Sequence, residues 1–202
     1  LVKGPIEGGA SVACQASFIL PPGNRGAGNL RFTVITDSAN NVSELNILGL
    51  AETNNSTSIT RVSALAAYPD LIVTNVTPSP AAGWLTGDTV SVNWTTRNQG
   101  TGSTTGAWTE TVRVRNLTTG HTLFTQTLAY DAAVLGDLAA SDWRARSLDL
   151  TWPPGADANG QIEFTVTTDA ASALFENNLP GTAESNNASQ LTVLSAPDLT
   201  VG

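Results

Sequence analysis

The sequence predicts an all-β protein made of tandem immunoglobulin-like or fibronectin-III-like antiparallel β-sandwiches. Three observations lead to this fold class. Apolar and polar residues alternate with a period of two, short runs are separated by Gly, Pro, Asn and Asp clusters, and one long segment occurs twice. Of the 202 residues, 41% are hydrophobic and only 13% are charged, so the chain can bury a core and is expected to form strands and turns rather than helices.

The repeated segment is the strongest signal. Residues 20–37 match residues 152–169 without a gap, at an offset of 132 (164 − 32), and the match continues to the Asn54-Asn55 and Asn186-Asn187 pairs. The triplet Pro69-Asp70-Leu71 returns 128 residues later, at 197–199. Each Pro-Asp-Leu is therefore predicted to open a new unit.

These matches divide the chain into three parts. We predict the C-terminal half of a first repeat at 1–67, a complete seven-stranded repeat at 68–195 and the start of a third repeat at 196–202. Half a sandwich cannot close its own sheets. We expect a longer parent chain, or a neighbouring copy in trans, to complete it.

Within 68–195 the alternation is clear enough to assign faces. Val90, Val92 and Trp94 fall on one face of a strand, while the residues between them are polar. The seven predicted strands are Leu71–Val76, Thr89–Asn98, Trp108–Arg115, Thr122–Tyr130, Trp143–Trp152, Gln161–Thr168 and Gln190–Leu194.

Charge and composition narrow the function classes. Nine Lys and Arg against seventeen Asp and Glu give a net charge of −8, so no nucleic acid or anionic lipid is expected as a partner. No apolar run is long enough to insert into a membrane. Cys14 is the single cysteine and His121 the single histidine, and no nucleophile motif accompanies them. The chain is predicted not to be an enzyme.

Several motifs carry a resemblance to a known family. They are Pro-Asp-Leu-Ile-Val at 69–73, Gly-Asp-Thr-Val-Ser-Val-Asn-Trp at 87–94, Asn-Gln-Gly-Thr-Gly at 98–102, and a Phe-x-Val-x-x-Asp strand at 164–169 that leads into Glu-x-Asn and Glu-x-Asn-Asn. This set resembles the CARDB family, the cell-adhesion-related domains of bacteria. The resemblance implies an immunoglobulin-like module, found in tandem in large extracellular or surface proteins of bacteria and archaea, that serves adhesion or spacing. The loop before Glu-x-Asn-Asn is longer here, at 47–50 and 179–182, than is common in that family.

A repeated polar loop is the candidate metal site. Carboxylate and amide oxygens are the ligands that calcium prefers, so calcium is the one cofactor hypothesis. The alternative is structural, because Asp and Asn also cap turns by accepting backbone N–H bonds. The candidate ligands are Asp37, Glu44, Asn46 and Glu52 in the first copy and Asp169, Glu176, Asn178 and Glu184 in the second.

Two tryptophans form the candidate ligand surface. Trp143 and Trp152 are an odd number of residues apart in one predicted strand, so they should point to opposite faces. The outward one could stack on a sugar or pack on a neighbour, whereas a bulge or an interdomain contact would explain it without a ligand.

Three functions follow from these patterns. The first is a structural or adhesion repeat of a large extracellular bacterial surface protein, acting as a spacer or adhesive stalk. The second is a subunit of a filament or surface layer assembled by strand complementation between chains. The third is a carbohydrate-binding accessory module. The expected partners are neighbouring repeats of the same or an identical chain, together with surface glycans or proteins.

Overall fold

Two strand-built units make up the described part of the chain. The computed structural model describes residues 5–195, and the chain separates into the units Leu1–Leu65 and Ala66–Gly202. The division into repeats at 1–67 and 68–195 stays a prediction. The predicted start of a third repeat, at 196–202, lies outside the described residues.

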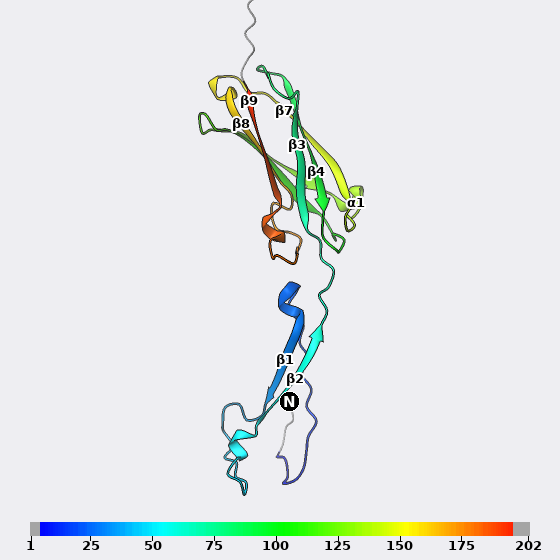
Figure 1. Cartoon of the computed structure of the whole chain (residues 1–202), viewed down its shortest axis with the longest axis vertical. Helices are drawn as coiled ribbons and strands as arrows, with labels where there is room; N and C mark the ends of the chain where they lie inside the picture. Colours follow the sequence, from blue (N-terminus) through cyan, green and yellow to red (C-terminus); the bar gives the residue numbers. More distant parts are fainter. Residues whose placement is uncertain (1–4, 196–202) are drawn as a thin grey trace, which may run out of the picture. The chain divides into compact units, whose positions relative to one another are not determined.

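The larger unit is an antiparallel β-sandwich, as the sequence predicts. One sheet has three strands in the order β3-β4-β7, and the other has four in the order β6-β5-β8-β9 (Figure 1). β6 pairs with β5 and does not join the first sheet, so the order is fibronectin-III-like and differs from that of constant-type immunoglobulin domains. The strands are Leu71–Ser79 (β3), Thr89–Asn98 (β4), Trp108–Asn116 (β5), Thr122–Tyr130 (β6), Trp143–Thr151 (β7), Gly160–Thr167 (β8) and Ala188–Ser195 (β9).

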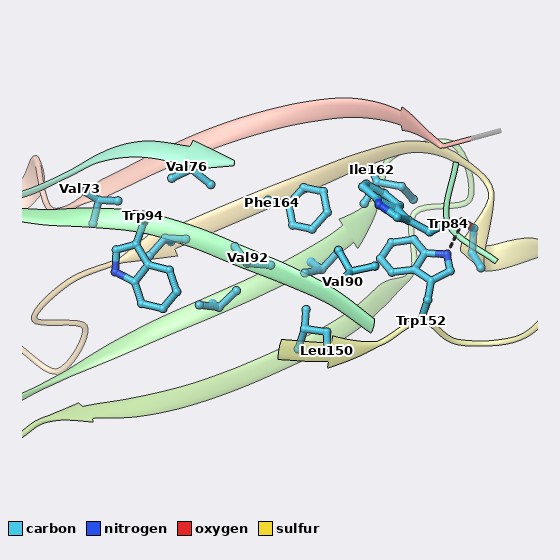
Figure 2. Packing of buried hydrophobic residues seen from close by; sticks show 14 residues of the cluster. Val73, Val76, Trp84, Val90, Val92, Trp94, Leu150, Trp152, Ile162 and Phe164 are labelled. Atoms are coloured by element: carbon cyan, nitrogen blue, oxygen red, sulfur yellow. Dashed lines mark hydrogen bonds between the residues drawn. The ribbon is translucent and has the colours of Figure 1, made fainter. Parts of the chain in front are cut away.

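A hydrophobic core fills the space between these sheets (Figure 2). Trp84 and Trp152 lie against each other with ring centroids 4.5 Å apart, and Phe164 meets Trp84 edge-on at 5.5 Å. Trp152 donates its indole N–H to the carbonyl of Ala158 at 3.2 Å. The large aromatic surface is therefore buried without leaving this indole donor unpaired.

The alternation in β4 sets which residues reach that core. Val90, Val92 and Trp94 are at most 2% exposed, which confirms the predicted inward face. β3 is less regular, because its pairing with β4 shifts between Thr74 and Thr77. Asn75 lies at this bulge with φ of 56°, in the left-handed region.

A buried ion pair joins the two sheets. Glu110 of β5 is fully buried, and its Oε2 accepts the Nε–H of Arg146 of β7 at 2.7 Å. Its Oε1 accepts hydrogen bonds from the Thr96 hydroxyl and the Trp94 indole of β4. Both carboxylate oxygens are thus hydrogen-bonded, which lowers the cost of burying the charge. The pattern of β5 places Glu110 on the inward face with Trp108, but no local pattern identifies its partner.

The glycines of the Asn-Gln-Gly-Thr-Gly motif permit a close backbone approach. A Cβ on Gly100 would lie 2.4 Å from the carbonyl oxygen of Tyr68, and one on Gly102 would lie 2.6 Å from that of Ala67. Thr101 and Gly102 both donate their N–H to the Tyr68 carbonyl, at 3.0 and 2.9 Å. The motif therefore anchors the segment that leads into β3.

Helical structure is limited to short turns, as the composition indicates. The single α-helix among residues 5–195, Ala132–Leu135 (α1), has four residues and is capped by Asp131, whose carboxylate accepts the N–H of Ala133 at 2.9 Å. The 3-10 turns are Gly23–Gly26 (η1), Ala51–Thr53 (η2), Ala156–Ala158 (η3) and Ala183–Ser185 (η4).

The smaller unit holds one antiparallel pair, Gly28–Ile35 (β1) and Ser56–Ser63 (β2), which run side by side (Figure 1). Its register runs from Gly28 opposite Ser63 to Ile35 opposite Ser56. The pair β8 and β9 has the same register 132 residues later, from Gly160 opposite Ser195 to Thr167 opposite Ala188.

Candidate functional site

The polar loops that connect these two strand pairs share their internal hydrogen bonds. The carboxylate of Asp37 accepts the N–H groups of Asn41 and Val42 at 2.8 and 2.9 Å, and that of Asp169 accepts the corresponding pair at 2.8 and 3.0 Å. Both aspartates have positive φ, 42° and 40°. Asp tolerates this backbone conformation better than most residues, so each copy has the same tight turn.

The glutamates of the two loops also bond in the same way. The N–H of Glu44 donates to Oε1 of Glu52 at 2.7 Å, and the N–H of Glu176 donates to Oε1 of Glu184 at 2.7 Å. Asn46 and Asn178 each accept a backbone N–H four residues ahead, at 3.0 and 2.8 Å. The predicted ligand atoms are therefore largely occupied as turn acceptors.

The second loop has a partner that the sequence analysis did not predict. Asp70, which is 4% exposed, accepts hydrogen bonds from the side-chain amides of Asn178 and Asn186, both at 2.9 Å, and of Gln99 at 3.1 Å. The carbonyl of Pro69 also accepts the N–H of Asn177 at 3.1 Å. The Pro-Asp-Leu triplet that marks the start of the unit is thus the segment that binds its loop.

Glu176 is the most perturbed group of this loop. It is 2% exposed and accepts the backbone N–H of Leu71 and the side-chain amide of Asn187. Burial raises the pKa of the Glu176 carboxyl to about 8, and these two hydrogen bonds only partly oppose the effect. Near neutral pH the carboxyl therefore holds its proton in most molecules.

The structure does not gather the predicted ligands into a metal site. Within residues 5–195, no three His, Cys, Asp or Glu side chains converge closely enough to hold a metal ion. Calcium binding stays a prediction from the sequence, and the observed contacts favour the structural alternative for Asp37, Glu44, Asn46 and Glu52 and for Asp169, Glu176, Asn178 and Glu184.

The two candidate tryptophans do point to opposite faces. Trp152 is 1% exposed and belongs to the core, so it is removed from the candidate ligand surface. Trp143 is 57% exposed at the start of β7. The alternation could not decide which of the two faces outward, because each strand face can be the buried one.

The remaining chemically active side chains lie apart from these loops. His121 lies on an exposed turn, where its Nδ1 is 2.9 Å from Oδ2 of Asp157. The hydrogen bond from His121 lowers the pKa of the Asp157 carboxyl. Cys14 is exposed in the other unit. The absence of enzyme activity stays a prediction from the sequence.

An open apolar face distinguishes β1 and β2. Val34 is 63% exposed and Ile59 is 47% exposed, and Phe32 is only half-buried. The matching residues of β8, Phe164 and Val166, are fully buried by the opposite sheet. Among residues 5–195, the smaller unit therefore has one strand pair and no second sheet that covers it.

No family model and no curated protein matches the sequence. The strand order and the packed sheets of the larger unit define the class: an immunoglobulin-like antiparallel β-sandwich.

Within that class, the chain resembles CARDB domains of solved structure. A CARDB domain from Pyrococcus furiosus, crystallised in complex with di-metal ions, has 16% sequence identity and a TM-score of 0.44, over 65% of this chain and 96% of that one. Its solution structure has 15% identity and a TM-score of 0.41, over 64% and 97%. The tandem array stays a prediction from the sequence.

Parts of larger enzymes also match. A β-glucosidase from Erythrobacter marinus has 12% identity and a TM-score of 0.39, and this chain spans only 16% of its length. A β-glucosidase from Listeria innocua has 13% identity and a TM-score of 0.35, and this chain spans 17% of its length.

Among residues 5–195, no helix has the length and apolar character needed to span a membrane.

Proposed function

We propose that the chain is a non-enzymatic structural repeat module of a large extracellular bacterial surface protein, and that it acts as a spacer or adhesive stalk. In such arrays each unit contacts only its neighbours, and sandwich modules supply length and mechanical stability without chemistry of their own. The proposed partners are neighbouring repeats of the same or an identical chain.

One observation carries this proposal. The β1–β2 pair has the register, the loop and the turn of β8–β9, but its apolar face is open where that of β8–β9 is closed. At roughly 25 cal/mol per Å² of apolar surface, covering several such side chains stabilises a fold by several kcal/mol. In the larger unit, the segment 69–152 contains the strands that cover the corresponding face. We therefore expect an equivalent segment to cover the β1–β2 face.

Light scattering over a range of concentrations tests the proposal. A spacer whose open half is completed within a longer parent chain is expected to remain a monomer of about 20.9 kDa at every concentration. In the same samples, hydrogen exchange is expected to be fast at the β1–β2 amides and slow at the β8–β9 amides. Equal protection of the two strand pairs in a monomer would contradict the proposal.

A filament or surface-layer subunit is the second candidate, favoured by the same open face. If chains complete one another in trans, the scattering mass should increase with concentration, and Val34→Asp should abolish the increase because it places a charge on the apolar face. Val134→Asp is a matched control, because Val134 is 77% exposed in the other unit. If the scattering mass still increases with concentration in both variants, the β1–β2 face is not the contact between chains.

A further inference from the structure

Trp143 differs from the other four tryptophans in its surroundings. Trp84, Trp94, Trp108 and Trp152 are at most 2% exposed, and each donates its indole N–H to an acceptor within the chain. Trp143 is 57% exposed, and no described residue accepts its indole N–H or stacks on its ring. A large apolar surface and a hydrogen-bond donor are thus both directed to the outside.

A groove lies beside this ring on the outer face of the three-stranded sheet β3-β4-β7. Its volume is about 460 Å³, within the range of small-molecule sites. The bulge at Asn75 and the turn at Ser141, with φ of 56° and 68°, belong to its wall. The lining residues are Thr74, Asn75, Thr95, Arg97, Ser141 and Trp143.

The charge of the groove is positive and unneutralised. Arg97 lies directly opposite Trp143 in the β4–β7 register, and no described residue gives it a hydrogen bond or an ion pair. The other arginines of this unit, Arg113, Arg115, Arg144 and Arg146, each have a partner. No carboxylate lines the groove, although the chain has a net charge of −8.

We propose that this groove binds an acidic saccharide. The C–H face of a pyranose ring would lie on the Trp143 indole, its carboxylate on the Arg97 guanidinium, and its hydroxyls against the side chains of Thr74, Asn75, Thr95 and Ser141. The proposal goes beyond the spacer function and does not depend on it, because the groove lies wholly within the larger unit.

The chemistry of the lining favours a saccharide over a macromolecular partner. Hydroxyl and amide groups can both donate and accept hydrogen bonds, which matches the hydroxyl groups of a sugar. A single exposed aromatic ring is too small a surface for a stable protein interface, which buries upwards of about 1,000 Å². One arginine is likewise too little positive charge for nucleic acid.

Titration with two trisaccharides tests the proposal. Trigalacturonate is the acidic probe and maltotriose the neutral one, each followed to about 10 mM by calorimetry and by tryptophan fluorescence. The wild-type chain is expected to bind trigalacturonate saturably and at least about 5-fold more tightly than maltotriose, with an affinity that falls as salt is added. Trp143→Ala is expected to weaken trigalacturonate binding by about 10-fold or more.

Charge-matched variants separate the role of Arg97 from net charge. Arg97→Gln is expected to remove the preference for the acidic probe, whereas Arg113→Gln, on the other sheet, should leave both affinities unchanged. The proposal is overturned by a wild-type chain that binds neither probe, by a preference for maltotriose, or by unchanged binding in Trp143→Ala. Dimerisation that depends on Trp143, without saccharide binding, would likewise overturn it in favour of a protein contact.

Discussion

The loops 36–55 and 168–187 have nearly the same internal hydrogen bonds but very different surroundings. The carboxylate of Asp37 is half-buried and that of Asp169 is 2% exposed, although both accept the same pair of backbone N–H groups. Ala51 and Ala183, in the short turns that follow, are buried in both copies. The shape of the loop is therefore a local property of its Asp, Asn and Gly residues, whereas its burial needs a second segment.

In the larger unit that second segment is the Pro-Asp-Leu triplet. Asp70 holds the two asparagines of the loop, and the N–H of Leu71 donates to Glu176. No such partner for Asn46 or Asn54 is present among residues 5–195. Variants at matching positions of the two copies therefore separate two contributions to the free energy of unfolding: that of the loop itself and that of the segment that packs on it.

The largest expected difference in the free energy of unfolding is between variants of the two matching phenylalanines, Phe164 in β8 and Phe32 in β1. Phe164→Ala should lower the free energy of unfolding of the larger unit by about 3 to 5 kcal/mol, because it leaves a cavity between the sheets. Phe32→Ala, at the matching position, should have an effect of about 1 kcal/mol or less on its own unit. All five tryptophans lie in the larger unit, so urea unfolding followed by their fluorescence reports that unit, and hydrogen exchange at the β1–β2 amides reports the smaller one. Equal losses in the two units would contradict the open-face description.

The next effect concerns the contact between the triplet and the loop. Asp70→Ala removes the acceptor of three side-chain amides, and we expect it to cost about 2 to 3 kcal/mol in the same unfolding experiment. Asp137→Ala is the control, since Asp137 is exposed and should contribute less than about 0.5 kcal/mol. If both variants lose the same small amount, the loop does not depend on Asp70.

The pH dependence of stability provides a third test. The folded-state pKa of Glu176 is raised to about 8 from 4.5, so the folded state binds the extra proton and its contribution to stability is lost as the pH rises from about 4.5 through about 8. Relative to Glu176→Gln, the wild-type melting temperature should therefore fall by at least about 5 °C between pH 5 and pH 9. Glu44→Gln, in the open loop, should follow the wild type at every pH. Parallel curves for wild type and Glu176→Gln would show that Glu176 does not titrate in this range.

Calcium should produce the smallest effect. Because the carboxylates already accept backbone N–H bonds, we expect addition of calcium chloride at about 5 mM to raise the melting temperature by no more than about 1 °C. Magnesium at the same concentration controls for ionic strength. A larger increase that is specific to calcium and absent from the Glu176→Gln, Glu184→Gln double variant would establish the metal site.

The sequence predicts most of the strands because each depends on a local pattern. All seven predicted runs of the larger unit become strands, and the inward face of β4 follows from Val90, Val92 and Trp94. The contacts within the candidate sites, in contrast, do not follow from a local sequence pattern. Asp70 meets Asn178 across 108 residues, and Arg97 lies opposite Trp143 only through the register of β4 and β7. No alternation within a strand encodes such pairings, since they depend on how the sheets assemble.

The buried pair of Glu110 and Arg146 has a further consequence for a chain in which one long segment occurs twice. At the offset of the repeat, the position of Arg146 is taken by Cys14 in the first copy (146 − 132 = 14). If that copy's segment replaced β7 during folding, Glu110 would be buried beside a thiol, and an uncompensated buried charge costs about 3 to 5 kcal/mol. The corresponding segment of the first copy therefore lacks the side chain that neutralises Glu110, and it could not replace β7 without leaving a buried charge unpaired.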